Sequence, residues 1–174
     1  MADLVEALEQ IEGLARIRIS SIEPTTLSPR LFDRMKNGKL CPYLHLPLQS
    51  GSNAVLSNMG RRYTREAYIA FVEEALDAVP GLCLGTDVMV GFPGEGEAEF
   101  EETVSLLEQL PFVYAHCFPF SERKGTRVTR MELPPVSAST MKARSHRLFE
   151  LSHQKKRAFY EAAIGQTVDL LFEG

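Results

Sequence analysis

The sequence has little cysteine, which limits the metal chemistry that the chain can carry by itself. It contains three cysteines, Cys41, Cys83 and Cys117. Zinc sites and iron–sulfur clusters usually draw on cysteines only a few residues apart, and these three are odd in number and far apart. We therefore expect three buried free thiols, and no metal centre built from the cysteines of this chain.

Long apolar runs are also missing, and we expect no secretory leader. The longest apolar stretches have the length of a β-strand, well short of the roughly 20 residues that cross a membrane. The N-terminus, MADLVEALEQIEGL, is acidic and amphipathic, whereas a signal peptide begins with basic residues and continues with an apolar core. We expect a cytoplasmic protein without membrane association, comprising one domain or most of one.

The net charge of −4 is unevenly distributed along the chain. Between residues 123 and 157 the sequence holds ten basic residues against two acidic ones, so the rest of the chain is strongly acidic. A basic stretch on an acidic body favours contact with a polyanion. The alternative is a solvated helix face whose lysines and arginines serve solubility.

Apolar periodicity predicts strands that alternate with helices. The expected strands cover residues 16–22, 43–48, 82–92, 112–120 and 167–173, and the expected helices cover residues 2–14, 28–37, 54–59, 64–79, 97–110 and 137–164. Repeated strand and helix units with right-handed crossovers give an α/β fold with a parallel sheet. The four strands before residue 121 do not suffice for a barrel of eight, so we expect part of a TIM-barrel-like (β/α) barrel.

Polar and glycine residues follow each of these four strands. They are Glu23, the turn 49–52, the turn 91–95 and the loop 121–126. Because ligands of parallel α/β proteins bind at the carboxyl ends of the strands, this edge is the predicted site. The competing interpretations are turns that only cap the next helix and, for Glu23, an ion pair with Arg16 or Arg18.

Two polar residues lie within the predicted strands themselves. Asp87 is the one charge in residues 82–92, and a buried carboxylate needs partners, so it indicates either a site or a satisfied structural network. His116 stands beside Cys117 in an apolar strand, and we interpret it as a core residue rather than a ligand.

Four stretches in this order resemble the radical S-adenosylmethionine methylthiotransferases: RIRISSIEP, HLPLQSGSNAVLSNMGRRYT, TDVMVGFPGE and HCFPFSERKGT. The resemblance covers nearly the whole chain up to Gly165. It implies a partial (β/α) barrel that binds S-adenosylmethionine and [4Fe-4S] clusters, and an activity that adds a methylthio group to C2 of an adenosine in tRNA. The SSIEP stretch and the last motif most resemble the branch that acts on threonylcarbamoyladenosine. The branches acting on isopentenyladenosine and on a ribosomal-protein aspartate are similar but weaker matches.

The resemblance also implies roles for individual residues. Positions that match motif residues facing S-adenosylmethionine are Glu23, Gln49 and the neighbouring Ser50, with Arg61 near its carboxylate, and Asp87 and the backbone at Phe118 lining the same pocket. The last motif places the nucleotide substrate near Arg123, Gly125 and Thr126. No catalytic residue and no metal ligand of this chain is implied.

The sequence departs from the family in lacking its CxxxCxxC cluster loop. We therefore expect a fragment that is inactive alone, comprising a partial barrel (residues 1–134), a basic helix packed on it (135–165) and the start of an RNA-binding β domain (166–174). An incomplete barrel leaves a sheet edge uncovered, so we also expect copies to associate through the strand near Arg16 or the N-terminal helix. The alternative from another class is a non-catalytic module that binds RNA or protein.

Overall fold

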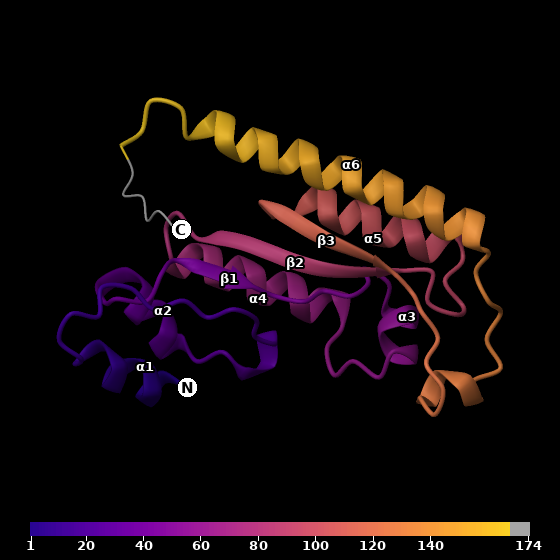
Figure 1. Ribbon diagram of the computed structural model, residues 1–174, viewed down its shortest axis with the longest axis horizontal. Coiled ribbons are helices and arrows are strands. Elements are labelled where there is room, and N and C mark those ends of the chain that lie inside the picture. The colour runs from indigo at the N-terminus through magenta and orange to yellow at the C-terminus, as the bar shows by residue number, and fades with distance from the viewer. Residues whose placement is uncertain (168–174) are drawn as a thin grey trace.

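The computed structural model describes residues 1–167, and a parallel sheet with helices packed against it forms its centre (Figure 1). The strands are β1 (Tyr43–His45), β2 (Cys83–Val90) and β3 (Tyr114–Pro119), in the order β1-β2-β3. The α-helices are α1 (Ala2–Glu9), α2 (Pro29–Asn37), α3 (Asn53–Asn58), α4 (Arg65–Ala78), α5 (Glu97–Gln109) and α6 (Ala138–Ala162), with short 3₁₀ turns at Pro24–Thr26 and Arg127–Arg130. The predicted α/β class, with parallel strands and flanking helices, is confirmed.

Strand β2 is the centre of the sheet, and its side chains alternate between two faces. Leu84, Thr86, Val88 and Val90 are buried on the face that we call the outer face, which the helices cover. In Figure 1, α4 and α5 lie behind the sheet and α6 runs along β3. Gly85, Asp87 and Met89 alternate with them and lie on the opposite face, which we call the inner face.

Helix starts follow the predicted capping residues. The side chains of Ser28, Thr64 and Ser137 accept hydrogen bonds from backbone N–H groups in the first turns of α2, α4 and α6. Each cap satisfies a donor that the helix itself leaves without a partner. Helix α1 is shorter than predicted and ends at Glu9, with Gln10 as its C-cap. The next apolar residue, Ile11, is half-exposed, so a further helical turn would bury little apolar surface, and Gly13 turns the chain with a positive φ of 79°.

The predicted strand at residues 16–22 does not form. These residues make one isolated bridge, between Ile17 and Leu40, and Ile22 donates its N–H to the carbonyl of His45. Ile17 and Ile19 are half-buried against the core and Ile22 is buried, so the segment packs on the core without forming a continuous ladder with a neighbouring strand. The predicted strand at 43–48 is also cut short, because Pro47 has no N–H for the ladder. There the hydroxyl of Thr86 accepts from Leu48 N–H and donates to Leu46 carbonyl.

Helix α6 belongs to the same core as the sheet. Leu148 is fully buried among the sheet side chains, and Ser152 Oγ both accepts from Ala115 N–H and donates to its carbonyl, at 2.9 Å each. Arg144 is buried and forms ion pairs with Glu95 at 2.8 Å and Glu97 at 2.9 Å. Across residues 1–167, no helix combines the length and apolar character needed to cross a membrane. The predicted strand at 167–173 lies almost wholly outside the described residues.

Candidate functional site

The segments that follow the three strands enclose a cavity of about 370 Å³. Gln49 follows β1, Met89 and Phe92 come from the end of β2, and Phe120 and Arg123 follow β3. The end of α3 and the residues after it complete the wall, and the 3₁₀ turn after the β3 exit loop adds its basic side. The segments after the strands therefore meet at one cavity, at the sheet edge where the sequence predicts a site.

Gln49 has a backbone conformation that the sequence does not reveal. Its φ is 67°, in the left-handed region that a residue with a side chain rarely adopts. Two backbone hydrogen bonds to β2 hold it there, from Gln49 N–H to the carbonyl of Asp87 at 2.8 Å and from Met89 N–H to the carbonyl of Gln49 at 2.9 Å. Such a conformation costs about 1–3 kcal/mol, and residues held in this way gather at binding sites. It turns the side chain of Gln49 into the cavity wall.

The turn after Gln49 serves to anchor the loop rather than to line the cavity. Ser50 is buried, its Oγ lies 3.3 Å from Thr103 Oγ1 of α5, and it accepts from Ser52 N–H. A Cβ at Gly51 would come within 2.6 Å of the α5 backbone, so only glycine permits this approach. The structure thus does not bring Ser50 to the cavity, and its predicted contact with the cofactor receives no support from this placement.

Arg61 lines the cavity and forms an ion pair with Glu23. The two side chains meet at 3.2 Å, with Arg61 30 % exposed and Glu23 52 % exposed. The sequence did not indicate Arg61 as a partner of Glu23, and the guanidinium of Arg18 lies 4.3 Å over the Tyr43 ring. Glu23 lies beside the cavity and does not line it. Its ion pair with Arg61 joins the segment that follows residues 16–22 to the segment that follows β1.

The loop after β3 contributes a polar and basic rim. Arg123 and Thr126, which the resemblance assigns to the nucleotide substrate, line the cavity, and Thr126 Oγ1 donates to the carbonyl of Arg123 at 2.8 Å. Gly125 supplies a φ of 82° for the turn and is not part of the wall. Sequence reasoning missed Arg127, which also lines the cavity, and the pair Phe92 and Phe120, whose rings meet edge to face at 5.4 Å.

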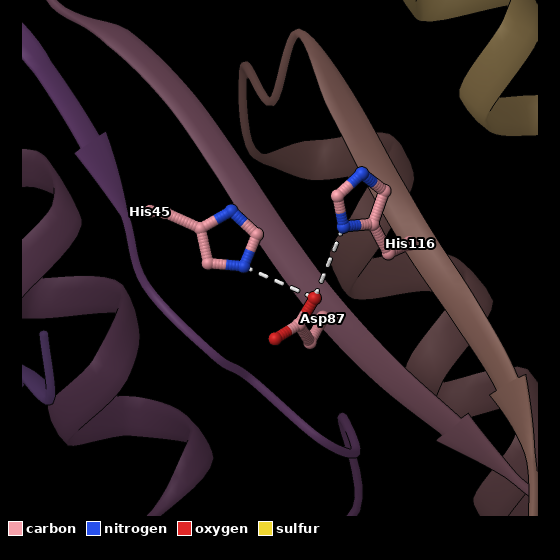
Figure 2. Close-up of side chains that lie close together, drawn as sticks. All are labelled: His45, Asp87 and His116. Atoms are coloured by element: carbon pink, nitrogen blue, oxygen red, sulfur yellow. Dashed lines mark ion pairs between the residues drawn. The ribbon is translucent and has the colours of Figure 1, made fainter. Parts of the chain in front are cut away.

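The predicted site residues within the strands lie on the inner face, outside the cavity wall. Asp87 Oδ1 is 3.0 Å from His45 Nε2 and 3.4 Å from His116 Nδ1 (Figure 2). Asp87 is thus in a polar cluster and does not line the cavity, and Phe118 is half-exposed on the neighbouring strand. The prediction that His116 is a core residue was wrong, because its side chain is 58 % exposed and faces Asp87. Strand alternation alone cannot tell which face lacks a covering helix.

The cysteines do not fit an iron–sulfur cluster. All three are free, as predicted, but each is half-buried rather than buried. Cys83 precedes the buried Leu84 in β2, so its side chain lies on the inner face. Cys117 of β3 is the direct neighbour of Val88 in the sheet, so its side chain lies on the outer face and packs against the core. The cysteine ligands of one cluster must surround a single small volume, so these thiols do not hold an iron–sulfur cluster together.

The cavity does fit a cofactor of the size and chemistry of S-adenosylmethionine. Its volume lies within the range of about 300–1,000 Å³ that small-molecule sites occupy. Its wall combines methionine and phenylalanine side chains with two amides, a serine and a threonine, and three guanidinium groups. An apolar wall suits a nucleoside base, and guanidinium groups suit a carboxylate or a phosphate.

Comparison with known proteins agrees with this picture. The model of the family described as "Radical SAM superfamily" matches residues 1–107. The chain is 41 % identical over 176 residues to "tRNA-2-methylthio-N(6)-dimethylallyladenosine synthase" of Moorella thermoacetica, covering 99 % of this chain and 39 % of that protein. It is 38 % identical over 176 residues to the protein of the same name from Staphylococcus haemolyticus, covering 100 % of this chain and 34 % of the relative.

The fold also resembles a solved structure. It is that of the radical SAM enzyme coproporphyrinogen III oxidase (HemN) from Escherichia coli, with a TM-score of 0.68 over 88 % of this chain and 36 % of that one. At 15 % identity this likeness shows the fold alone. The chain spans well under half the length of these curated relatives. Because the family model matches more than half of its residues, the chain belongs to the radical SAM superfamily.

Proposed function

We propose that this chain provides the S-adenosylmethionine pocket and part of the substrate entrance of a methylthiotransferase that acts on an adenosine in tRNA. The observation that carries the proposal is that one cavity is lined by Gln49 and Arg61, from the connection between β1 and β2, and by Arg123, from the loop after β3. The names of the relatives supply the reaction and the tRNA substrate. S-adenosylmethionine, bound at a cluster that this chain's cysteines do not hold, supplies the radical chemistry of such enzymes. The share of these residues is to bind, orient and exclude water.

Within the pocket, Arg61 is the residue that we assign to the carboxylate of S-adenosylmethionine. A guanidinium binds a carboxylate through two parallel hydrogen bonds, which fixes both position and orientation. Glu23, which pairs with Arg61 at 3.2 Å, is half-exposed, so it can accept hydrogen bonds from the cofactor's amine or a ribose hydroxyl without the cost of burying a charge. Gln49 offers an amide at the cavity wall for the same polar groups.

The basic rim is the part that we assign to the tRNA. Within residues 1–167, no ion pair joins Arg123, Lys124, Arg127 or Arg130 to an acidic side chain, so these cations are available to phosphates. The basic helix α6 is a poorer candidate along the side where Arg144 and Arg147 already pair with glutamates. Phosphate contacts of this kind position a nucleic acid without reading its sequence.

Two adenosine substrates remain candidates. The relatives' name favours N(6)-dimethylallyladenosine, the isopentenyladenosine alternative of the sequence analysis. The SSIEP stretch and the HCFPFSERKGT motif favour threonylcarbamoyladenosine by resemblance. We propose the dimethylallyl substrate as the first candidate, because the relatives with this name match almost the whole chain.

A hybrid enzyme tests both the reaction and the substrate. This chain replaces the matching segment of the Moorella relative, and the hybrid is expressed in bacteria that lack their own tRNA methylthiotransferases. Mass spectrometry of digested tRNA is expected to show 2-methylthio-N(6)-dimethylallyladenosine. A product on threonylcarbamoyladenosine would assign the other branch. A folded hybrid that carries its clusters but yields neither nucleoside would contradict the proposal and favour a non-catalytic binding module. The unmodified relative is the positive control.

A further inference from the structure

Three metal-ligating side chains from three adjacent strands converge on the inner face of the sheet, separate from the cavity wall. His45 Nε2 and His116 Nδ1 both approach the same oxygen of Asp87, at 3.0 Å and 3.4 Å (Figure 2). The three ligand atoms all lie within 4.8 Å of one another. We propose that His45, Asp87 and His116 bind one divalent transition-metal ion, in a site that is independent of the S-adenosylmethionine pocket and of the cysteines.

The sheet register fixes this convergence. Asp87 of β2 is the direct partner of His116 of β3, and His45 of β1 is the partner of Gly85, one row away on the same face of β2. The strands are held by their parallel ladders, so the three side chains start from rigid positions. Sites whose ligands project from regular elements keep their geometry better than sites on loops.

A second set of contacts orients His45. Its Nδ1 lies 3.1 Å from the hydroxyl of Tyr114, which also meets the hydroxyl of Tyr43. The Tyr114 ring occupies the space over Gly85, where a Cβ would come within 2.4 Å of it. Metal-binding histidines commonly make such a hydrogen bond with the nitrogen that does not bind the ion, and this contact fixes the ring. The cluster therefore has an outer layer as well as ligands.

The distances and the ligand types together select the kind of ion. With metal–ligand bonds of about 2.0–2.1 Å, the donor atoms of a tetrahedral site lie about 3.3–3.4 Å apart, close to the two separations observed. Two imidazoles and one carboxylate suit zinc, cobalt, nickel or iron(II) rather than calcium or magnesium, which prefer oxygen ligands. His45 is buried and His116 is exposed, so the ion is held from the protein side and completes its coordination with water on the open side.

The proposed metal site lies close to the cavity at the ends of the strands. Met89, which lines the cavity, follows Asp87 by two residues on the same face of β2, so the ion stands about 7 Å along the strand from the cavity wall. Without an ion, His45 Nε2 and His116 Nδ1 face the same oxygen of Asp87 at 3.0 Å and 3.4 Å. An ion binds through the lone pairs of these two nitrogens, and a nitrogen that binds the ion cannot also carry a proton.

Titration with Co²⁺ tests the proposal. The chain is prepared without a histidine tag, stripped with a chelator and titrated with Co²⁺, whose visible absorption reports bound cobalt, and then with Zn²⁺ as competitor. One equivalent of Co²⁺ is expected to bind and to be displaced by Zn²⁺. His116→Gln, at an exposed position, is expected to weaken binding at least about tenfold and to retain the native circular dichroism spectrum. Asp87→Asn is expected to weaken it similarly.

Matched variants separate this site from the other ligands of the chain. Of the four histidines, His146 and His153 lie on α6, and the double variant His146→Gln/His153→Gln is expected to bind Co²⁺ as the unmodified chain does. The triple replacement of Cys41, Cys83 and Cys117 by serine is also expected to leave binding unchanged. Absence of stoichiometric Co²⁺ binding, equal affinity in His116→Gln, or loss of binding in the cysteine variant would each overturn the proposal.

Discussion

At the scale of single residues, Arg61 has the most specific expected role in the site. Its side chain is one of three guanidinium groups in the cavity wall, and it has an acidic partner, Glu23, at 3.2 Å. Both partners are partly exposed, and ion pairs between such groups contribute about 0–1 kcal/mol to stability. We therefore expect a change at Arg61 to affect ligand binding more than stability.

We predict that Arg61→Met weakens binding of S-adenosylmethionine at least about tenfold, because the carboxylate loses a bidentate partner. Isothermal titration calorimetry measures the affinity, and urea denaturation checks that stability changes by less than about 1 kcal/mol. The matched control is Arg62→Met, since Arg62 is the exposed neighbour that does not line this cavity. Equal weakening by both variants would remove Arg61 from its assigned role.

Cys117 provides a second prediction at this scale. Burial, and secondarily the charge of Asp87, raises the pKa of its thiol to about 11. At pH 8, the thiolate fraction of Cys117 is about 200-fold lower than that of an ordinary thiol with a pKa of about 8.5. The thiolate of a more basic thiol reacts faster, here by about tenfold, which offsets part of this difference in the alkylation rate. In a Cys41→Ser/Cys83→Ser variant, we expect iodoacetamide to modify Cys117 at least tenfold more slowly than glutathione.

The raised pKa of Cys117 makes both the stability of the fold and the rate of this alkylation depend on pH. The folded pKa is raised, so the contribution of the neutral thiol to stability is fully present below the unfolded pKa of about 8.5 and is lost as pH rises towards 11. The alkylation rate is expected to keep rising over this interval. A plateau near pH 9 would show that the thiol is not held in a raised-pKa environment.

Single residues also mark the limits of reasoning from sequence. The motifs identified Gln49, Arg61, Arg123 and Thr126, all of which line the cavity. They did not reveal the positive φ of Gln49, which depends on backbone bonds to β2 thirty-eight to forty residues away. They also gave no sign that His116 faces Asp87, because that contact depends on strand register and on the face the helices leave open.

At the scale of elements, the helices were easier to predict than the strands. Helix caps and apolar stripes are local, so Ser28, Thr64 and Ser137 marked their helices correctly. A strand needs a partner at the right distance, and residues 16–22 have the alternation without sufficient pairing. Helix α6 contacts the segment after β2 through the buried Arg144, which in the sequence is only one of ten basic residues between 123 and 157.

We predict that Arg144→Met destabilises the chain by about 3–5 kcal/mol, because it leaves Glu95 as a buried carboxylate without its cation. Burial raises the pKa of Glu95, and the guanidinium opposes that shift. Losing Arg144 therefore raises the pKa of Glu95 further. The loss of stability is expected to be smaller at pH 5, where the carboxyl can be protonated, than at pH 8. Urea denaturation at both pH values measures it.

The controls for this prediction lie in the same ion-pair group. Glu97→Gln removes the other acidic partner of Arg144. Because the Glu97 side chain is 72 % exposed, this change should lower the free energy of unfolding by about 1 kcal/mol or less. Adding Glu95→Gln to Arg144→Met should recover part of the stability, since the buried charge is then gone. A double variant no more stable than the single one would mean that packing around Arg144, rather than the charge of Glu95, causes the loss.

At the scale of the whole molecule, the described chain has one continuous core. Val5 of α1, Leu31 of α2, Leu84 of β2, Leu107 of α5 and Leu148 of α6 all belong to it. The division into a barrel segment of residues 1–134 and a helix of residues 135–165 stays a prediction, as does association between copies. The exposed Met1, Leu4 and Ile11 offer an apolar surface for such association.

Because helices from both ends of the described chain share this core, we predict a single cooperative unfolding transition. Far-ultraviolet circular dichroism follows the helices, and tyrosine fluorescence follows the core around the buried Tyr68, in a chain that has no tryptophan. The two signals are expected to give the same urea midpoint. Leu148→Ala, which leaves a cavity under α6, should lower both midpoints together and cost about 2–5 kcal/mol. If α6 unfolded first, the dichroism midpoint alone would fall, and the helix would have to be treated as a separate folding unit docked on the sheet.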